Sequence, residues 1–508
     1  MKTTLRKLTT AWPLVILLLL PALMRAETAV QAWVQRYNGT GNGSDQATAV
    51  AVDGSNNVIV TGYSEGGGGN YDYVTIKYSM VGVPLWTNRY NGLNGTDEAT
   101  AVAVDGSNNV IVTGWSDTGF GEAYATIKYS STGVPLWTNR YGGTEDYSVK
   151  AYAVAVDGSD NVIVTGFSAT IKYSSTGLAL WTNVNVHAEA VAVDGSNNVI
   201  VTGFSGSIYD YATVKYSSAG VPLWTNVYNG PGNYWDEACA VAVDGSNNVI
   251  VTGYSASTNL SAHNYDYATI KYSSAGEPLW TNRYNGPGDR DDYACAVTVD
   301  SSNNVIVTGY SADSQSFPHY ATIKYSPAGE SLWTNRYNGP GNGDDWANAV
   351  AVDASNNVIV TGYSTGSAGG YATIKYSAAG VPLWTNLYNG PGGYGYNEGS
   401  ALAVDRSGNV IVTGYSLGSG GVHDYATVKY TCVPSPVVSG LQLTNGTFQM
   451  RVDGVLQPGT LVIVASTNLS TTNWAPVFTN TTPTNVLFYT DPDAGNRLRR
   501  FYRAFQFP

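Results

Sequence analysis

The chain has 508 residues and a formal net charge of -12, and only 12% of its residues are charged, about half the ~25% that is usual for soluble domains. Its 38 tyrosines outnumber its 25 lysines and arginines. An acidic surface repels phosphate, so this balance excludes nucleic acid as a partner. Four histidines and three cysteines are too few for a zinc cluster or a dense disulfide framework.

Residues 1–26 have the pattern of a secretory signal peptide. Lys2, Arg6 and Lys7 form a basic start, Leu14–Leu20 is an apolar run, and Ala26 fits a cleavage site. Seven apolar residues are too few to span a bilayer, which needs ~20. No other long apolar run follows. We therefore expect a secreted, extracellular or cell-surface protein with no transmembrane span in the mature chain.

Internal repetition dominates the rest of the sequence. The string AVAVDGSNNVIVTGYS recurs with small changes at intervals of 37 to 56 residues. Repeats of this length are typical of propellers and arrays. The aspartate of the string falls at Asp53, Asp105, Asp157, Asp194, Asp244, Asp300, Asp353 and Asp405.

Each repeat contains four runs that predict β-strands. In the second copy they are Ala101–Asp105, Asn109–Gly114, Tyr124–Ser130 and Pro135–Tyr141, all rich in Val, Ile, Thr, Tyr and Trp. Tight Gly- and Ser-containing turns join the first to the second run and the third to the fourth. Each repeat is therefore predicted to form one four-stranded blade with its first run innermost.

The order of the runs predicts how the ring closes. The tryptophan of the fourth run occurs eight times, but Trp33 precedes every inner strand and no such run follows Lys429. We predict that the segment 32–37 supplies the outer strand of the last blade, which removes exposed sheet edges. The fold class is thus all-β: an eight-bladed β-propeller of four-stranded blades over 27–432, then a linker over 433–437 and a small β module over 438–508. An open spiral is the alternative.

Two stretches resemble known families. The string AVAVDGSNNVIVTGYS, followed by YATIKYSSTGVPLWTNRYGG, resembles the SBBP-type bacterial β-propeller repeat over roughly residues 30 to 432. That resemblance implies a secreted or surface protein without an assigned activity. The segment STGVPLW is also similar to repeats of quinone-dependent dehydrogenases, which would imply a quinone and a calcium site. Near the end, STNLSTTNW and RFYR resemble the C-terminal β modules of secreted bacterial proteins, which implies attachment or export.

One face of the predicted ring carries the sequence variation. Loops from the second to the third strand, and from each blade to the next, share a face that we call the variable-loop face. Glu65–Tyr73 and Ala256–Tyr267 are long, whereas Ser168 is followed at once by Ala169. Because loops on a rigid scaffold carry function, a partner is expected to dock there.

Acids and aromatics gather at the start of the inner strands. As candidate ligands of a cation such as calcium we single out Asp45, Asp97, Asp236, Asp292 and Asp345. Candidate ligand-binding residues, suited to sugars through ring stacking and hydrogen bonds, are Trp235, Asp236, Asp292, Tyr293, Asp345, Trp346, Tyr394 and Tyr396. The alternatives are that each aspartate holds its own turn and that the aromatic rings pack between blades.

Two further sets have structural interpretations. The repeat Asp and Lys residues recur too regularly for a ligand site, so they predict interblade pairs or solvated positions. Cys239 and Cys295 share one register in adjacent blades, which leaves a disulfide and two buried thiols both open.

Taken together, the sequence predicts a secreted or cell-surface, non-catalytic propeller. It would be a monomer that binds a glycan or an extracellular protein on the variable-loop face, with no required cofactor. The alternatives are an extracellular enzyme and a structural matrix protein. The enzyme would be a quinone-dependent oxidoreductase, or a polysaccharide lyase or hydrolase. An enzyme would show converging acid, base and cation-binding groups in a deep pocket.

Overall fold

A computed structural model describes most of the chain from residue 27 onwards. The part of it before Pro434 and the part after it fall into separate compact units, one spanning Ala29–Val433 and the other containing Pro434–Pro508. The described residues are 27–508 without 94, 120, 143–148, 185, 207–208, 258–263, 366–368, 394–396, 435–436, 445–446, 454–459, 467–474, 482–485, 492–500 and 508.

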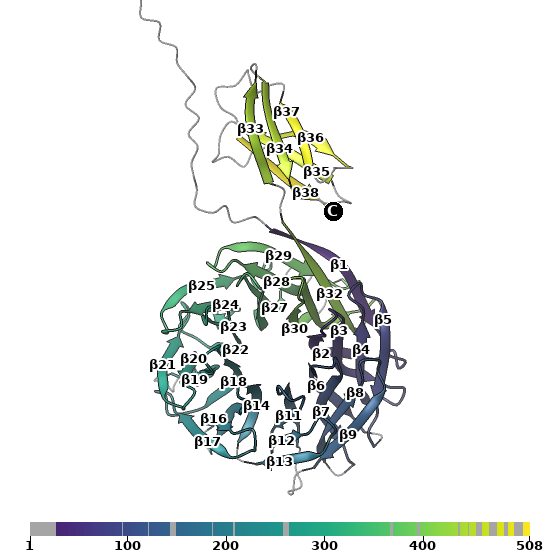
Figure 1. Cartoon of the computed structure of the whole chain (residues 1–508), viewed down its shortest axis with the longest axis vertical. Coiled ribbons are helices and arrows are strands. Elements are labelled where there is room, and N and C mark those ends of the chain that lie inside the picture. The colour runs from purple at the N-terminus through teal and green to yellow at the C-terminus, as the bar shows by residue number, and fades with distance from the viewer. Residues whose placement is uncertain are drawn as a thin grey trace, which may run out of the picture. The chain divides into compact units, whose positions relative to one another are not determined.

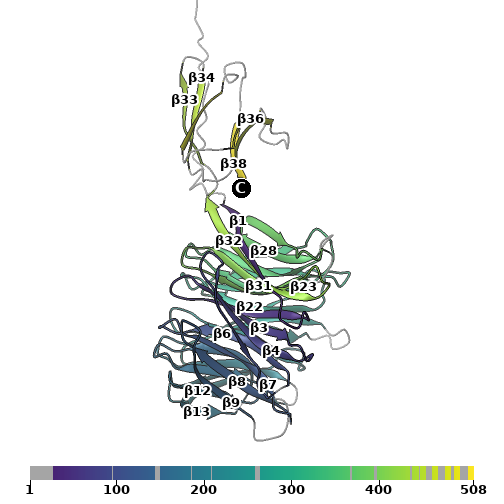
Figure 2. The same cartoon turned by 90° about the vertical axis from the view of Figure 1, so that its right-hand side faces the viewer.

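The first unit is the predicted eight-bladed β-propeller. Within the described residues it has eight four-stranded antiparallel sheets around a central channel and no helix (Figure 1). Figure 2 shows the same ring from its edge. In blades 1 to 7 the four strands follow one another from the channel outward, so the first strand of each repeat is innermost, as expected.

The strands of each blade have the following bounds. Blades 1 and 2 contain β2 (Asp45–Val52), β3 (Val58–Glu65), β4 (Tyr71–Tyr78), β5 (Pro84–Tyr90), β6 (Asp97–Val104), β7 (Val110–Asp117), β8 (Glu122–Tyr129) and β9 (Pro135–Tyr141). Blades 3 and 4 contain β10 (Ala151–Val156), β11 (Val162–Gly166), β12 (Thr170–Tyr173), β13 (Ala179–Asn183), β14 (His187–Val193), β15 (Val199–Ser205), β16 (Asp210–Tyr216) and β17 (Pro222–Tyr228). Blades 5 and 6 contain β18 (Asp236–Val243), β19 (Val249–Ala256), β20 (Tyr265–Tyr272), β21 (Pro278–Tyr284), β22 (Asp292–Val299), β23 (Val305–Ala312), β24 (Pro318–Tyr325) and β25 (Ser331–Tyr337). Blade 7 contains β26 (Asp345–Val352), β27 (Val358–Ser364), β28 (Gly370–Tyr376) and β29 (Pro382–Tyr388).

Blade 8 combines both ends of the propeller sequence. It contains β30 (Glu398–Val404), β31 (Val410–Leu417), β32 (His423–Pro434) and β1 (Glu27–Tyr37), in that order from the channel outward. The N-terminal strand therefore closes the ring, as the position of Trp33 predicts.

Packing between neighbouring sheets explains the apolar second strands. Val110 and Val112 of β7 pack with Ile59 of blade 1, whereas Ile111 packs with Val162 of blade 3. Successive side chains of a strand point to opposite faces of its sheet. Because both faces are covered by another blade, all three residues of β7 are fully buried.

A buried ion pair recurs in every blade. The repeat aspartate at the end of the inner strand pairs with the repeat lysine of the third strand, as Asp105 does with Lys128 at 2.8 Å. The expected interblade pairs therefore form within a blade. The lysine crosses to the next blade by a different bond, since Lys128 Nζ donates to the Ser175 carbonyl at 3.1 Å. The eight pairs are Asp53–Lys77, Asp105–Lys128, Asp157–Lys172, Asp194–Lys215, Asp244–Lys271, Asp300–Lys324, Asp353–Lys375 and Asp405–Lys429.

The repeat tryptophan adds a second hydrogen bond to the next blade beside that of the lysine, and we call this pair of bonds the joint between blades. Trp86 Nε1 and Lys77 Nζ both donate to the Ser131 carbonyl of blade 2, at 3.2 and 3.1 Å. Gly133 in the same turn has φ of 88°, and a Cβ built on it would lie 2.8 Å from Trp86 Cγ. Only glycine fits there, because both the backbone and the contact exclude a side chain.

The second unit consists of two three-stranded sheets. One has the order β33 (Val437–Thr444), β34 (Thr447–Asp453), β37 (Val486–Asp491), and the other β36 (Ala475–Asn480), β35 (Thr460–Ser466), β38 (Phe501–Phe507). Met450 and Val452 of β34 share a core with Leu461 and Ile463 of β35, so the two sheets pack face to face. No helix long and apolar enough to cross a membrane occurs in the described parts of either unit.

Removal of one partner of a buried pair should strongly destabilise the ring. Asp105→Asn leaves Lys128 charged and without its counterion, and we expect a loss of about 3–5 kcal/mol in the free energy of unfolding. Denaturant unfolding followed by circular dichroism measures this loss. The control is the double variant Asp105→Asn with Lys128→Met, which removes both charges and should recover most of the stability. A single variant as stable as the parent would contradict the role given to the pair.

Candidate functional site

The candidate aspartates are buried beneath the variable-loop face. Asp45, Asp97, Asp236, Asp292 and Asp345 have 0% exposure. Each accepts a hydrogen bond from a glycine N–H of the preceding loop, at 2.6–2.9 Å. Burial raises the pKa of Asp292 to about 7. Each of these carboxylates therefore holds the loop that leads into its inner strand, which agrees with the structural alternative that the sequence left open.

The two cysteines are on the neighbouring inner strands β18 and β22. Both Cys239 and Cys295 are free thiols. Burial raises the pKa of Cys295 to about 12, so this thiol is protonated at neutral pH. Of the two alternatives left open by the sequence, the structure has the free thiols.

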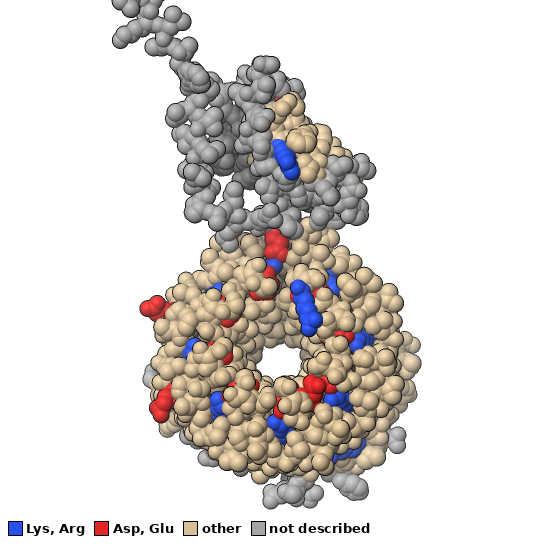
Figure 3. Space-filling model, viewed as in Figure 1, with Lys and Arg blue, Asp and Glu red and all other residues tan. Residues whose placement is uncertain are grey.

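Residues beside the buried aspartates border the channel instead. The inner strands of adjacent blades contact one another around the opening of the ring, which Figure 3 shows in space-filling form. Two positions of each inner strand differ from blade to blade while their neighbours stay almost constant. The first position holds Gln46, Glu98, Lys150, His187, Glu237, Tyr293, Trp346 and Glu398, and the second holds Thr48, Thr100, Tyr152, Glu189, Cys239, Cys295, Asn348 and Ser400.

Acidic side chains at this mouth are tied to tyrosines and amides. Tyr254 donates to Glu237 Oε2 and Tyr415 donates to Glu398 Oε2, each at 2.6 Å. Burial, with the nearby charge of Glu237, raises the pKa of Glu189 to about 7. Among all described residues no group of three or more His, Cys, Asp or Glu side chains is placed to hold a metal ion.

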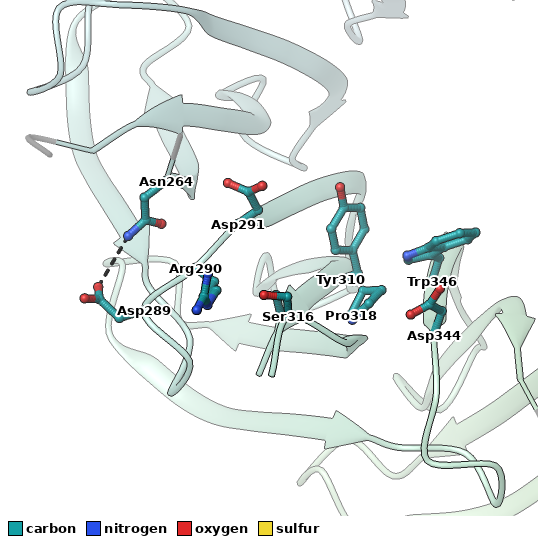
Figure 4. Close-up of a pocket in the computed structure, with 10 residues that line it drawn as sticks. Asn264, Asp289, Arg290, Asp291, Tyr310, Ser316, Pro318, Asp344 and Trp346 are labelled. Carbon is teal, nitrogen blue, oxygen red and sulfur yellow. Dashed lines mark hydrogen bonds between the residues drawn. The ribbon is translucent and has the colours of Figure 1, made fainter. Parts of the chain in front are cut away.

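A pocket of about 380 Å³ opens on the same face, where loops of blades 5, 6 and 7 meet (Figure 4). Its lining carries two aromatic rings, three carboxylates, a guanidinium and an amide. In Figure 4 Asn264 and Asp289 are at one end, and Trp346 and Asp344 are at the other. The lining residues are Asn264, Asp289, Arg290, Asp291, Tyr310, Ala312, Ser316, Pro318, Asp344 and Trp346.

The aromatic candidates have three different placements. Trp346 lines the pocket, and Tyr293 stacks on the pocket residue Tyr310 with ring centroids 5.1 Å apart. Trp235 is exposed on the variable-loop face, and its ring is stacked parallel to that of Tyr234, with centroids 5.6 Å apart and an interplanar angle of 5°. Tyr394 and Tyr396 lie outside the described residues.

Several residues of the site were not singled out from the sequence. Tyr310, Glu189, Asp291 and Asp344 are examples. The available signal was the variation among blades at two positions of the inner strand, since the scaffold keeps nearly every neighbouring position constant. Asp344 and Asp291 directly precede buried aspartates, and their orientation toward the pocket depends on the loop conformation.

Comparison with known proteins identifies the class but no family. The repeats and the closed ring define a β-propeller repeat protein, and no family model matches the chain. An uncharacterized WD repeat-containing protein of Acanthamoeba polyphaga mimivirus is 29% identical over 203 residues, which are 35% of this chain and only 14% of that protein. Sqt1 from Chaetomium thermophilum is 11% identical with a TM-score of 0.49, over 79% of this chain and 99% of that one. A Lactobacillus plantarum protein is 12% identical with a TM-score of 0.42, over 68% and 98%.

Neutralising Glu189 should stabilise the propeller only at high pH. Its folded-state pKa of about 7 is above the usual 4.5, so ionisation is more costly in the folded chain than in the unfolded one. Glu189→Gln should therefore have no effect near pH 4, and its stabilisation should grow as the pH rises and level off above 7, at no more than ~3 kcal/mol. Thermal unfolding across this range measures the effect. The exposed Glu330→Gln is the control, and a pH-independent effect would contradict the assignment.

Proposed function

We propose that the protein is a secreted or cell-surface, non-catalytic propeller that binds a glycan on its variable-loop face. The observation that carries the proposal is the pocket between blades 5 and 7, where Tyr310 and Trp346 lie beside the carboxylates of Asp291 and Asp344. Aromatic rings offer flat apolar faces to sugar rings, and carboxylates accept hydrogen bonds from sugar hydroxyls. A concave site of a few hundred Å³ with few polar groups is typical for small ligands.

The arrangement of the pocket supports binding at a defined geometry. Asn264 Nδ2 donates to Asp289 Oδ1 at 3.4 Å, and Asp291 Oδ1 accepts the Tyr265 N–H at 3.3 Å. Tyr310 is held by its stacking on Tyr293, and Trp346 by its ring contact with Tyr363. Neighbours therefore limit the freedom of the rings and carboxylates before a ligand arrives, which reduces the entropy lost on binding.

Export from the cytoplasm is part of the proposal. The pattern of residues 1–26 and the resemblance to SBBP-type repeats both support it. The exported chain should begin at Glu27, which N-terminal sequencing of the purified protein measures. Replacing Leu17 with Arg interrupts the apolar run and should keep the chain inside the cell with residues 1–26 attached. A chain that is exported equally well with that substitution would contradict the signal-peptide assignment.

A glycan that binds the folded chain should raise its unfolding temperature. At one hundred times the dissociation constant the stabilisation is ~2.7 kcal/mol. We expect one or a few members of a panel of soluble polysaccharides to give this shift, and Trp346→Ala to abolish or reduce it. Leu136→Ala, which removes an exposed side chain of the outer strand β9, is the control and should leave the shift unchanged.

Two other outcomes of the same panel would contradict the proposal. Release of reducing ends or unsaturated sugars from a bound polysaccharide would favour the hydrolase or lyase alternative. A shift with pyrroloquinoline quinone and calcium would favour an oxidoreductase.

A further inference from the structure

Six aromatic rings form a continuous chain of contacts across blades 3 to 5, outside the pocket. Successive ring centroids are 4.1 to 5.6 Å apart. Every ring belongs to the variable-loop end of its blade, either in a loop or at the adjoining end of a strand. We call this feature the aromatic strip, and its members in order of contact are Phe167, His187, Phe204, Tyr209, Trp235 and Tyr234.

The strip lies where the repeat departs most from its pattern. The interval between Asp157 and Asp194 is the shortest in the chain, at 37 residues. Where five blades have the buried aspartate and blade 8 has Asn397, blades 3 and 4 have Val149 and Val186, which pack into their blade cores. The loop of blade 3 between β11 and β12 is only three residues long, and Phe167 is the first of them. Among the described residues, the short β11–β12 loop of blade 3 therefore leaves Phe167 partly exposed.

Exposure and composition favour a ligand that stacks on rings. Phe167, Tyr209 and Tyr234 are 39% exposed and Trp235 is 45% exposed. Exposed aliphatic side chains are concentrated elsewhere, on outer strands and on the tight turns of the opposite face, as with Leu136 and Leu223.

The strip itself offers no positive charge to a polyanion. Burial lowers the pKa of His187, so its ring is neutral at pH 7 and stacks on Phe204 without a charge. The whole chain has a net charge of -12, which repels anionic polymers.

The loops hold the strip in one geometry. The Asp236 N–H donates to the Tyr209 carbonyl at 2.8 Å, which ties the blade 4 loop to the start of β18 beside Trp235. Tyr124 of blade 2 accepts hydrogen bonds from the N–H groups of Ser168 and Ala169 in blade 3, at 3.2 and 3.1 Å, and so fixes the backbone that follows Phe167. A preformed row of rings suits a ligand with a repeating shape.

We propose that the aromatic strip binds an extended, neutral polysaccharide chain by stacking successive sugar rings on its exposed aromatic faces. This inference rests on the proposed function and adds the ligand class and its path across blades 3 to 5. The pocket lined by Trp346 then takes either a separate part of the same chain or a different ligand.

Affinity electrophoresis and calorimetry of the full chain test the proposal. The probes are neutral β-glucan, xylan and galactomannan, the polyanion alginate, and a ladder of oligosaccharides of increasing length. We expect binding to a neutral polymer, no binding to alginate, and an affinity that rises with oligosaccharide length because each added sugar meets another ring. Trp235→Ala and Tyr209→Ala should each weaken binding about tenfold, which corresponds to ~1.4 kcal/mol for one stacked ring.

Matched variants separate stacking from misfolding. Trp235→Phe keeps an aromatic face and should retain most of the affinity. Leu223→Ala removes an exposed side chain from the outer strand β17 of blade 4 and should change nothing. Because the strip residues tested are exposed, their variants should unfold at the parent's temperature, and a loss of affinity at unchanged stability supports the proposal.

These experiments distinguish a failure of the proposed function from a failure of the strip proposal. If the parent chain binds no glycan, the proposed function fails and the strip proposal fails with it. If a glycan binds and only Trp346→Ala weakens it, the proposed function stands and the strip proposal is wrong. Preferential binding of alginate would also overturn the strip proposal. The same holds if a protein ligand loses affinity for the Trp235→Ala variant while no glycan binds the chain.

Discussion

The buried Asp–Lys pair is the interaction on which the rest of the ring depends. Taking two charges out of water is costly, and their attraction offsets that cost only when the remaining hydrogen bonds are made. Here they are made. Asp105 accepts bonds from the backbone and side chain of Asn109 in its own hairpin, and Lys128 donates to a carbonyl of the next blade. Burial alone would raise the pKa of Asp105, but bonds from Lys128 and Asn109 outweigh it and hold the pKa below its usual value.

The same requirement explains an irregular joint between blades 7 and 8. Because β1 arrives from the N-terminus, blade 8 lacks the turn that elsewhere offers its carbonyl to the preceding lysine and tryptophan. At this joint Lys375 Nζ contacts Cys432 Sγ at 3.7 Å, and Trp384 Nε1 has no hydrogen-bond partner among the described residues. At the next joint the pattern is complete, since Trp33 and Lys429 both donate to the Met80 carbonyl. Among the described residues, closure by the N-terminal strand thus leaves Trp384 without the bond that its seven counterparts make.

The fold could be predicted from the repeats in the sequence, whereas the candidate site could be located only from the three-dimensional structure. The strands and their order in each blade follow from the sequence because the same runs recur in every repeat. Closure by the strand of Trp33 follows because this run precedes every inner strand and none like it follows the last repeat. The buried aspartates were chosen as candidate ligands because acids gather at the start of the inner strands, but the bond from Gly39 to Asp45 spans a loop whose conformation the sequence pattern does not reveal. Strand alternation places Gln46 and Glu98 on the opposite side from those aspartates, which is why the channel mouth is formed by their neighbours. The pocket and the strip depend on contacts between blades, such as Tyr209 with Trp235, that no single repeat contains.

Because the bonds between neighbouring blades are nearly identical around the ring, the loops can differ from blade to blade. The pocket and the aromatic strip are two contrasting results of this variation. Around blades 5 to 7 the loops are long enough to wall a pocket, and its carboxylates and rings converge on a small volume. Around blades 3 and 4 the repeat is short, and Phe167 and Tyr209 remain uncovered on an open surface. A walled pocket suits a chain end or a short ligand, whereas an open row of rings suits the middle of a long one. A single polymer contacting both would gain affinity from their linkage without any new contact, because the second binding event is intramolecular.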